Sequence, residues 1–243
     1  MNKGILSLIG LLLYAGCQTA PQPEETETAE PVATEAPAMQ RPDPMNPEGG
    51  EGAVPSGWQV RLDKHDAMTE IGADSESADI FFVNMAPGWH IRTGPAAIFY
   101  HPDNAANGSY EALMEVHLFN PGERREAFGM IFGGRNLDGV DQKYDYFLIR
   151  NSGEFLIKRR NGENTQVIQD WTASDAIVRY TNPDEPSVLN TLRVRVGESD
   201  VEFVINDQVV ATHPKEHMDT DGIVGMRINH ALNLHVSNLA VIE

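Results

Sequence analysis

The sequence predicts an all-β domain built as a two-sheet sandwich, which follows an acidic and disordered N-terminal tether. Three observations favour this fold class. From residue 57 onward, short runs rich in Val, Ile, Phe and Tyr alternate with clusters of Gly, Asn, Asp and Pro, as strands alternate with turns. No stretch sustains the i, i+3, i+4, i+7 apolar spacing of an amphipathic helix. Cys17 is the only cysteine, so the fold relies on its apolar core rather than on a disulfide.

Residues 1–16 have the composition of an export signal. Lys3 supplies a positive charge, and the uncharged apolar run at 4–13 is shorter than the ~20 residues that span a bilayer. The next residues, Leu13-Tyr14-Ala15-Gly16-Cys17, resemble a bacterial lipobox, with Tyr14 where leucine is usual. The resemblance implies cleavage before Cys17 and lipidation of that cysteine. It also implies a membrane anchor in the bacterial cell envelope, and Gln18 favours the outer membrane.

Residues 17–56, from the lipidated cysteine to the domain, are expected to form a disordered linker. Residues 18–56 hold eight acidic side chains and one arginine, are rich in Pro, Glu and Thr, and offer almost nothing apolar to bury. A flexible chain of this length has an end-to-end distance of about 35 Å. The segment is therefore predicted to be a tether.

The domain is predicted to occupy residues 57–243, with at most one short helix near 174–180. It carries 28 acidic and 16 basic side chains, and such an acidic surface excludes a nucleic-acid function. The expected strands are 79–84, 90–93, 96–100, 110–120, 127–133, 144–150, 154–159, 165–169, 191–196, 201–205, 208–212, 222–228 and 232–241. About a dozen strands at this spacing favour two packed sheets.

The C-terminal third carries a family resemblance. The run VEFVINDQVV from Val201, then DGIVGMR from Asp221, then the strand at 232–241, resemble the end of a concanavalin A-like (laminin G-like) jelly roll. The likeness covers about residues 79–243 and implies a jelly-roll sandwich. More remotely, the chain is similar to the 3-keto-disaccharide hydrolase-like domains of bacterial secreted proteins. These motifs describe a fold and specify no activity.

The segment 110–119 has the clearest alternation of two faces. Its core-facing set is expected to be Ala112, Met114, Val116 and Leu118, and its other face holds Glu111, Leu113, Glu115 and His117. Long polar and aromatic side chains on this and later strands suggest a ligand-binding groove. The candidate residues of that groove are Glu115, His117, Arg135, Tyr146, Arg150 and Lys158.

The sequence segments that could carry catalytic carboxylates or bind calcium do not match the known motifs for those functions. Family 16 glycoside hydrolases, which have folds resembling this one, place carboxylates on alternate residues of one strand, but here Leu113 stands between Glu111 and Glu115. The loop 133–145 contains Asp138, Asp141 and Asp145, whose spacing does not match an EF-hand. A solvated turn is favoured there and a calcium site is the alternative, so no cofactor is expected.

Three functions remain open at this point. The first is a non-catalytic, surface-tethered domain that binds a glycan or glycoconjugate. The second is a glycoside-cleaving enzyme of the 3-keto-disaccharide hydrolase type. The third is an envelope module whose partner is another protein. No single residue of the sequence decides among them.

Overall fold

The computed structural model describes residues 54–64 and 66–243. The predicted signal segment, Cys17 and the tether up to residue 53 lie outside the described residues. Val54 packs against the main core and Pro55 is buried, so these two residues belong to the sandwich.

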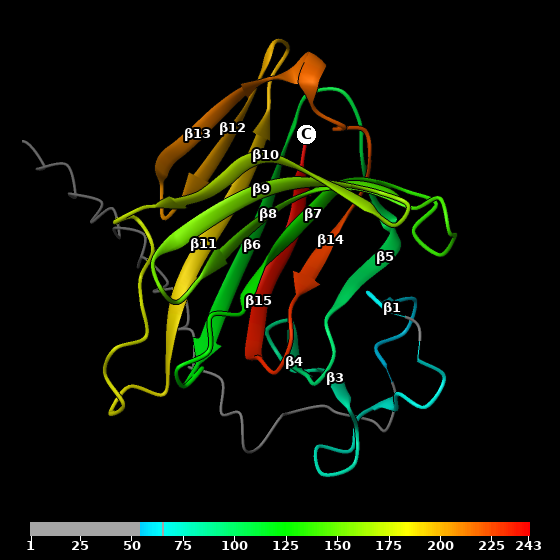
Figure 1. Ribbon diagram of the computed structural model, residues 1–243, viewed down its shortest axis with the longest axis vertical. Helices are drawn as coiled ribbons and strands as arrows, with labels where there is room; N and C mark the ends of the chain where they lie inside the picture. Colours follow the sequence, from blue (N-terminus) through cyan, green and yellow to red (C-terminus); the bar gives the residue numbers. More distant parts are fainter. Residues whose placement is uncertain (1–53, 65) are drawn as a thin grey trace, which may run out of the picture. The chain divides into compact units, whose positions relative to one another are not determined.

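The described chain forms two stacked sheets, and the predicted jelly-roll sandwich is confirmed (Figure 1). Sheet A contains, in spatial order, β1 (Gln59–Leu62), β5 (Ala97–Ala106), β14 (Gly222–Ile228), β7 (Ala127–Arg135), β8 (Lys143–Arg150), β9 (Glu154–Asn161) and β10 (Asn164–Ala173). Sheet B contains β13 (Gln208–Pro214), β12 (Asp200–Ile205), β11 (Ser187–Val196), β6 (Tyr110–Phe119), β15 (Asn233–Ile242), β4 (Trp89–Thr93), β3 (Ile80–Asn84) and β2 (Ile71–Gly72). Strands far apart in sequence therefore become neighbours, as β14 does between β5 and β7.

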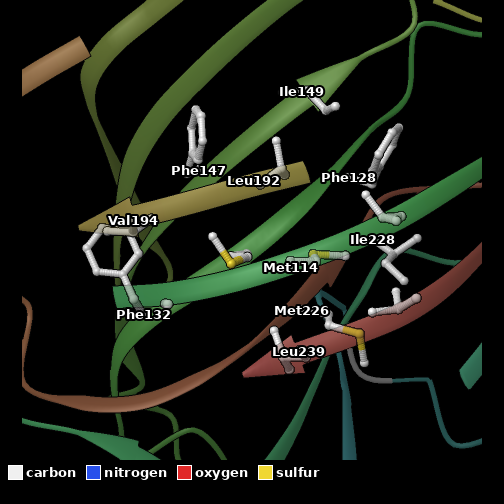
Figure 2. Close-up of a cluster of buried hydrophobic side chains, with 14 of the residues drawn as sticks. Met114, Phe128, Phe132, Phe147, Ile149, Leu192, Val194, Met226, Ile228 and Leu239 are labelled. Atoms are coloured by element: carbon white, nitrogen blue, oxygen red, sulfur yellow. The ribbon is translucent and has the colours of Figure 1, made fainter. Parts of the chain in front are cut away.

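The main core lies between the sheets. The core-facing set predicted for β6 is confirmed, because Ala112, Met114 and Val116 are 0% exposed and Leu118 is 1% exposed. Figure 2 shows Met114 of β6 and Leu192 and Val194 of β11 together with side chains from sheet A. Those side chains include Phe128 and Phe132 of β7 and Phe147 of β8. Interdigitation of two inner faces is what holds a sandwich together.

Sheet A also buries apolar side chains on its other face, which we call the outer face of sheet A. Alternate residues of a strand point to opposite sides, so Phe147 and Ile149 enter the main core while Tyr146 and Leu148 face outward. These outward side chains are buried too, in a second apolar cluster of Ile98, Tyr100, Ala127, Ile131, Leu137, Tyr144, Tyr146, Leu148 and Leu156. Burial on both faces explains the nearly continuous apolar run of β8.

The segment 174–180, where at most one short helix was expected, contains no helix. That segment is an irregular turn, in which Asn190 donates to the Val178 carbonyl and accepts from the Val178 amide, both at 2.8 Å. The helical content of the described residues is one 3₁₀ turn, Lys215–His217. No helix in the described part of the chain is long and apolar enough to cross a membrane. The short strands β1 and β2 were not predicted from the sequence.

Candidate ligand-binding pocket

The six residues predicted to line one groove lie on two different sheets. Glu115 and His117 are on β6 in sheet B, and they face away from the core. Tyr146, Arg150 and Lys158 are on β8 and β9 in sheet A and share its outer face. The main core lies between the two sets. The prediction of one shared groove is therefore wrong, because sequence parity identifies a strand's outward face but not the sheet to which the strand belongs.

The outward set on sheet A does not form one cluster either. The Arg150 guanidinium lies 3.9 Å from the centre of the Trp171 ring and pairs with Glu154. Lys158 lies beside Tyr146 in the register of β8 and β9. Arg135 is exposed at the end of β7 and is separate, because it binds Asp219.

The three aspartates proposed as calcium ligands do not converge. Asp145 is fully buried, where it accepts two hydrogen bonds from Arg159 and one from the Asp219 amide. Burial raises the pKa of Asp145 although Arg159 opposes the shift. Asp141 accepts a hydrogen bond from Asn136, whereas Asp138 faces a pocket. Among residues 54–64 and 66–243, no three His, Cys, Asp or Glu side chains are placed to share a metal ion.

A pocket of about 940 Å³ opens on the outer face of sheet A. Its wall combines β1, the loop that follows β1, Ile71 of β2, Tyr100 of β5, the β7–β8 loop, Arg160 of β9 and Glu163 of the β9–β10 turn. The lining residues are Gln59, Val60, Arg61, Leu62, Asp63, Lys64, Asp66, Ala67, Thr69, Ile71, Tyr100, Asp138, Val140, Gln142, Arg160 and Glu163.

A buried ion pair supports the pocket wall. Arg227 of β14 makes a two-pronged contact with Asp63, in which Nη1 and Oδ1 are 2.7 Å apart. The same Nη1 atom lies 3.2 Å from the Tyr144 hydroxyl, and the guanidinium lies over the Tyr146 ring at 5.2 Å. Burial alone would raise the pKa of Asp63, but the hydrogen bonds and charge of Arg227 hold it below its ordinary value. Asp63 is therefore ionised and committed to Arg227.

The tyrosines of this face act as neutral groups. Tyr100 donates a 2.7 Å hydrogen bond to the Gln59 side-chain oxygen. Burial raises the pKa of Tyr100, and it raises the pKa of Tyr146 to about 12. Both hydroxyls therefore keep their protons at neutral pH and can donate hydrogen bonds.

Two further arginines lie on the pocket wall with few protein partners. Arg61 donates from Nη1 to the Leu137 carbonyl at 3.0 Å, and its Nε is buried without a partner in the described part of the chain. Arg160 donates from Nε to the Gly162 carbonyl. Sequence reasoning missed both residues. The alternation of Arg61 with Val60 and Leu62 was an available signal, but the strand has only four residues.

Comparisons with known proteins identify the fold. No family model matches the chain, and no curated protein matches its sequence. The carbohydrate-binding module CBM66 from Bacillus subtilis superposes with a TM-score of 0.51 and 11% identity, over 77% of this chain and 96% of that module. A GH16 protein of the Bacteroides ovatus mixed-linkage glucan locus gives 0.45 at 8% identity, over 76% and 94%. Sheep galectin-11 gives 0.42 at 10% identity, over 57% and 92%. The fold is a concanavalin A-like jelly roll.

Proposed function

We propose that this chain is a non-catalytic glycan-binding domain whose ligand occupies the pocket on the outer face of sheet A. The observation that carries the proposal is the make-up of the pocket wall. Planar polar side chains from Gln59, Arg61, Gln142 and Arg160 surround the same space as Tyr100. The volume, about 940 Å³, falls within the range of roughly 300–1,000 Å³ that small-ligand sites occupy.

A sugar hydroxyl can donate and accept hydrogen bonds. A glycan-binding site therefore needs both hydrogen-bond donors and hydrogen-bond acceptors in fixed positions. The amides of Gln59 and Gln142 offer both, whereas the guanidinium groups offer donors only. Gln142 is only 4% exposed, and Tyr100 orients Gln59. Positions fixed before binding reduce the entropy lost when a ligand is ordered. The likeness to CBM66, a carbohydrate-binding module by its name, supports the same choice at the level of fold.

The hydrolase alternative has little support from the carboxylates. Glycoside hydrolysis needs a carboxylic acid that stays protonated near neutral pH and a second carboxylate nearby. Asp63, the half-buried carboxylate of the pocket, is held ionised by Arg227. Glu111 on sheet B is paired with Arg193 and Arg195 at 2.7 and 2.8 Å. Each is already committed to arginine.

The protein-interaction alternative also has little support. The large apolar side chains exposed in the described residues lie on different elements of both sheets and on separate loops. They are Met68, Val140, Val167, Val178, Leu189, Val209 and Ile242. An interaction surface would be expected to gather such side chains into one patch.

We further propose that the domain is displayed on the bacterial cell envelope by a lipid on Cys17, with residues 18–53 as the tether. The support is the lipobox-like sequence that ends at Cys17 and the Pro- and Glu-rich composition that follows it. A diacyl or triacyl anchor would hold the domain stably at the surface, because two chains suffice where one is marginal.

A glycan microarray probed with residues 41–243, which contain the whole sandwich, tests the binding proposal. The chain is expected to bind a defined set of glycans, and Ala67→Trp is expected to abolish that binding by filling the pocket. Ala67 is exposed on the pocket wall, so the substitution does not disturb the core. Ala105→Trp, at an exposed position of β5 outside the pocket, is the control. Binding that survives Ala67→Trp would reject this pocket as the site.

A further inference from the structure

Four half-buried arginines of the described residues pair with a carboxylate, whereas Arg61, Arg92 and Arg160 do not, and two of these three line the pocket. The arginines with an acidic partner are Arg135, Arg150, Arg159, Arg193, Arg195 and Arg227. Arg61 and Arg160 are half-buried as well, yet within residues 54–64 and 66–243 neither forms an ion pair. Both line the pocket, so its wall carries two guanidinium groups that form no ion pair with a described residue, although the charge of Arg160 contributes to the lowered pKa of Asp63.

Most N–H donors of these two side chains also have no acceptor among the residues that the structure describes. A guanidinium has five N–H donors in a planar fork. The structure gives Arg61 one acceptor, the Leu137 carbonyl, and gives Arg160 one acceptor, the Gly162 carbonyl. By contrast, the Arg227 guanidinium contacts both Asp63 carboxylate oxygens and the Tyr144 hydroxyl. We infer that the remaining Nη donors of Arg61 and Arg160 are the groups that contact a ligand, whereas Arg61 Nε is buried.

Within the described residues, none of the pocket carboxylates forms an ion pair with these arginines. Asp63 is committed to Arg227, and its charge is balanced there. Asp66, Asp138 and Glu163 also lie on the wall, but all three are exposed and none pairs with Arg61 or Arg160 in the described residues. Lys64 adds a further positive charge at the rim. Counted with Arg227, the cationic and acidic side chains of the wall are equal in number, so the pocket is close to neutral in a chain whose formal net charge is −18.

We propose that the pocket binds glycans through an anionic sugar residue, whose charged oxygens contact Arg61 and Arg160. This inference rests on the proposed glycan-binding function and narrows its ligand class. A uronic acid carboxylate and a sulfate ester share the required chemistry, because a guanidinium fork donates to two oxygens of either group. Non-specific electrostatic attraction would not lead to binding of an anionic glycan, because the acidic surface of the domain repels polyanions.

The experiment compares charged and neutral forms of one backbone by calorimetric titration of residues 41–243. One arm uses polygalacturonate oligosaccharides against their carboxyl-reduced counterparts, and the other uses dextran sulfate oligosaccharides against dextran. We expect binding to the charged member of one pair and at least tenfold weaker binding to its neutral member. Arg61→Gln and Arg160→Gln should each weaken that binding about tenfold or more, the range for charge-assisted hydrogen bonds. Arg124→Gln, at an exposed arginine without an ion pair among the described residues, should leave it unchanged.

The outcomes separate this inference from the proposed function. Equal or stronger binding of the neutral members would overturn the anionic ligand class and leave the glycan-binding function in place. Charged binding that is unaffected by both pocket variants would overturn the assignment to Arg61 and Arg160. If no member of either pair binds, the anionic class fails, and the microarray then decides separately whether any glycan binds. Circular dichroism of each variant confirms that the fold is retained.

Discussion

At the scale of single residues, the ion pair of Arg227 and Asp63 places a charged guanidinium in the interior of the protein. The Arg227 side chain is 10% exposed and that of Asp63 27% exposed, so the guanidinium is almost wholly removed from water. A buried cation is tolerated only when a carboxylate and further hydrogen bonds compensate for its lost hydration. Asp63 supplies the carboxylate from the loop after β1, and Tyr144 contacts the same guanidinium from β8. This contact joins the pocket loop to the centre of sheet A.

Asp63→Asn should therefore destabilise the domain by about 3 kcal/mol, because it leaves the buried Arg227 charge without a counterion. Urea unfolding at neutral pH measures the effect. Asp184→Asn serves as the control, since Asp184 is exposed and its carboxylate has no contact in the described structure. A loss below about 1 kcal/mol for Asp63→Asn would show that the pair does not hold the pocket loop in place.

Among elements, the strands β4, β15 and β6 align three histidines on the outward side of sheet B. His90, His235 and His117 are register neighbours, with ring centres 6.2 and 5.9 Å apart. His90 is 2% exposed and His235 is 0% exposed, and the Pro87 carbonyl lies 2.7 Å from His235 Nε2. Burial lowers the pKa of both residues to about 4. Their neutral forms are therefore part of the folded state.

The burial of His90 and His235 predicts that the free energy of unfolding decreases as the pH is lowered. An unfolded histidine has a pKa near 6.5, so between about pH 6.5 and 4 the unfolded chain binds protons that the folded chain excludes. The free energy of unfolding is then highest above about pH 6.5. It should fall by up to about 1.4 kcal/mol per pH unit for each buried histidine as the pH decreases. Urea unfolding at several pH values between 7 and 5 measures this slope.

His90→Gln should lower the slope by up to about 1.4 kcal/mol per pH unit, the contribution of one buried histidine, whatever its effect on stability at pH 7. His217→Gln is the matched control, because the His217 side chain is 69% exposed. Contributions from carboxylates, Asp145 included, are common to all three proteins and cancel in the comparison. An identical slope in wild type and His90→Gln would contradict the assignment to this row.

In the whole molecule, the sequence predicted the layers better than the site. The strands from β3 to β15 were expected because their apolar residues alternate and their turns carry Gly, Asn or Asp, and the inward face of β6 followed from parity alone. The site requires strand order, which local patterns do not encode. β1 joins the edge of sheet A next to β5, although residues 63–96 separate the two strands, and so brings Arg61 near Tyr100.

The errors have the same physical origin. Glu115 and Tyr146 both face outward on their strands, but β6 and β8 pair in different sheets and the two faces point away from each other. The loop 133–145 contains three aspartates, for which a calcium site was the alternative to a solvated turn. In the structure Gly133 has a φ of 62° and packs against the Asp219 backbone, while Asp145 turns inward to Arg159. Long-range contacts therefore determine the role of each of these residues.

Hydrogen exchange of backbone amides, measured with and without a saturating glycan found on the microarray, tests the central claim most directly. The claim predicts slower exchange around the pocket, in β1, the loop after β1, Tyr100 of β5 and the β9–β10 turn that follows Arg160. It predicts unchanged exchange on sheet B around Glu115 and His117. Protection confined to β6, β11 and β15 would contradict it and place the binding face on the opposite sheet.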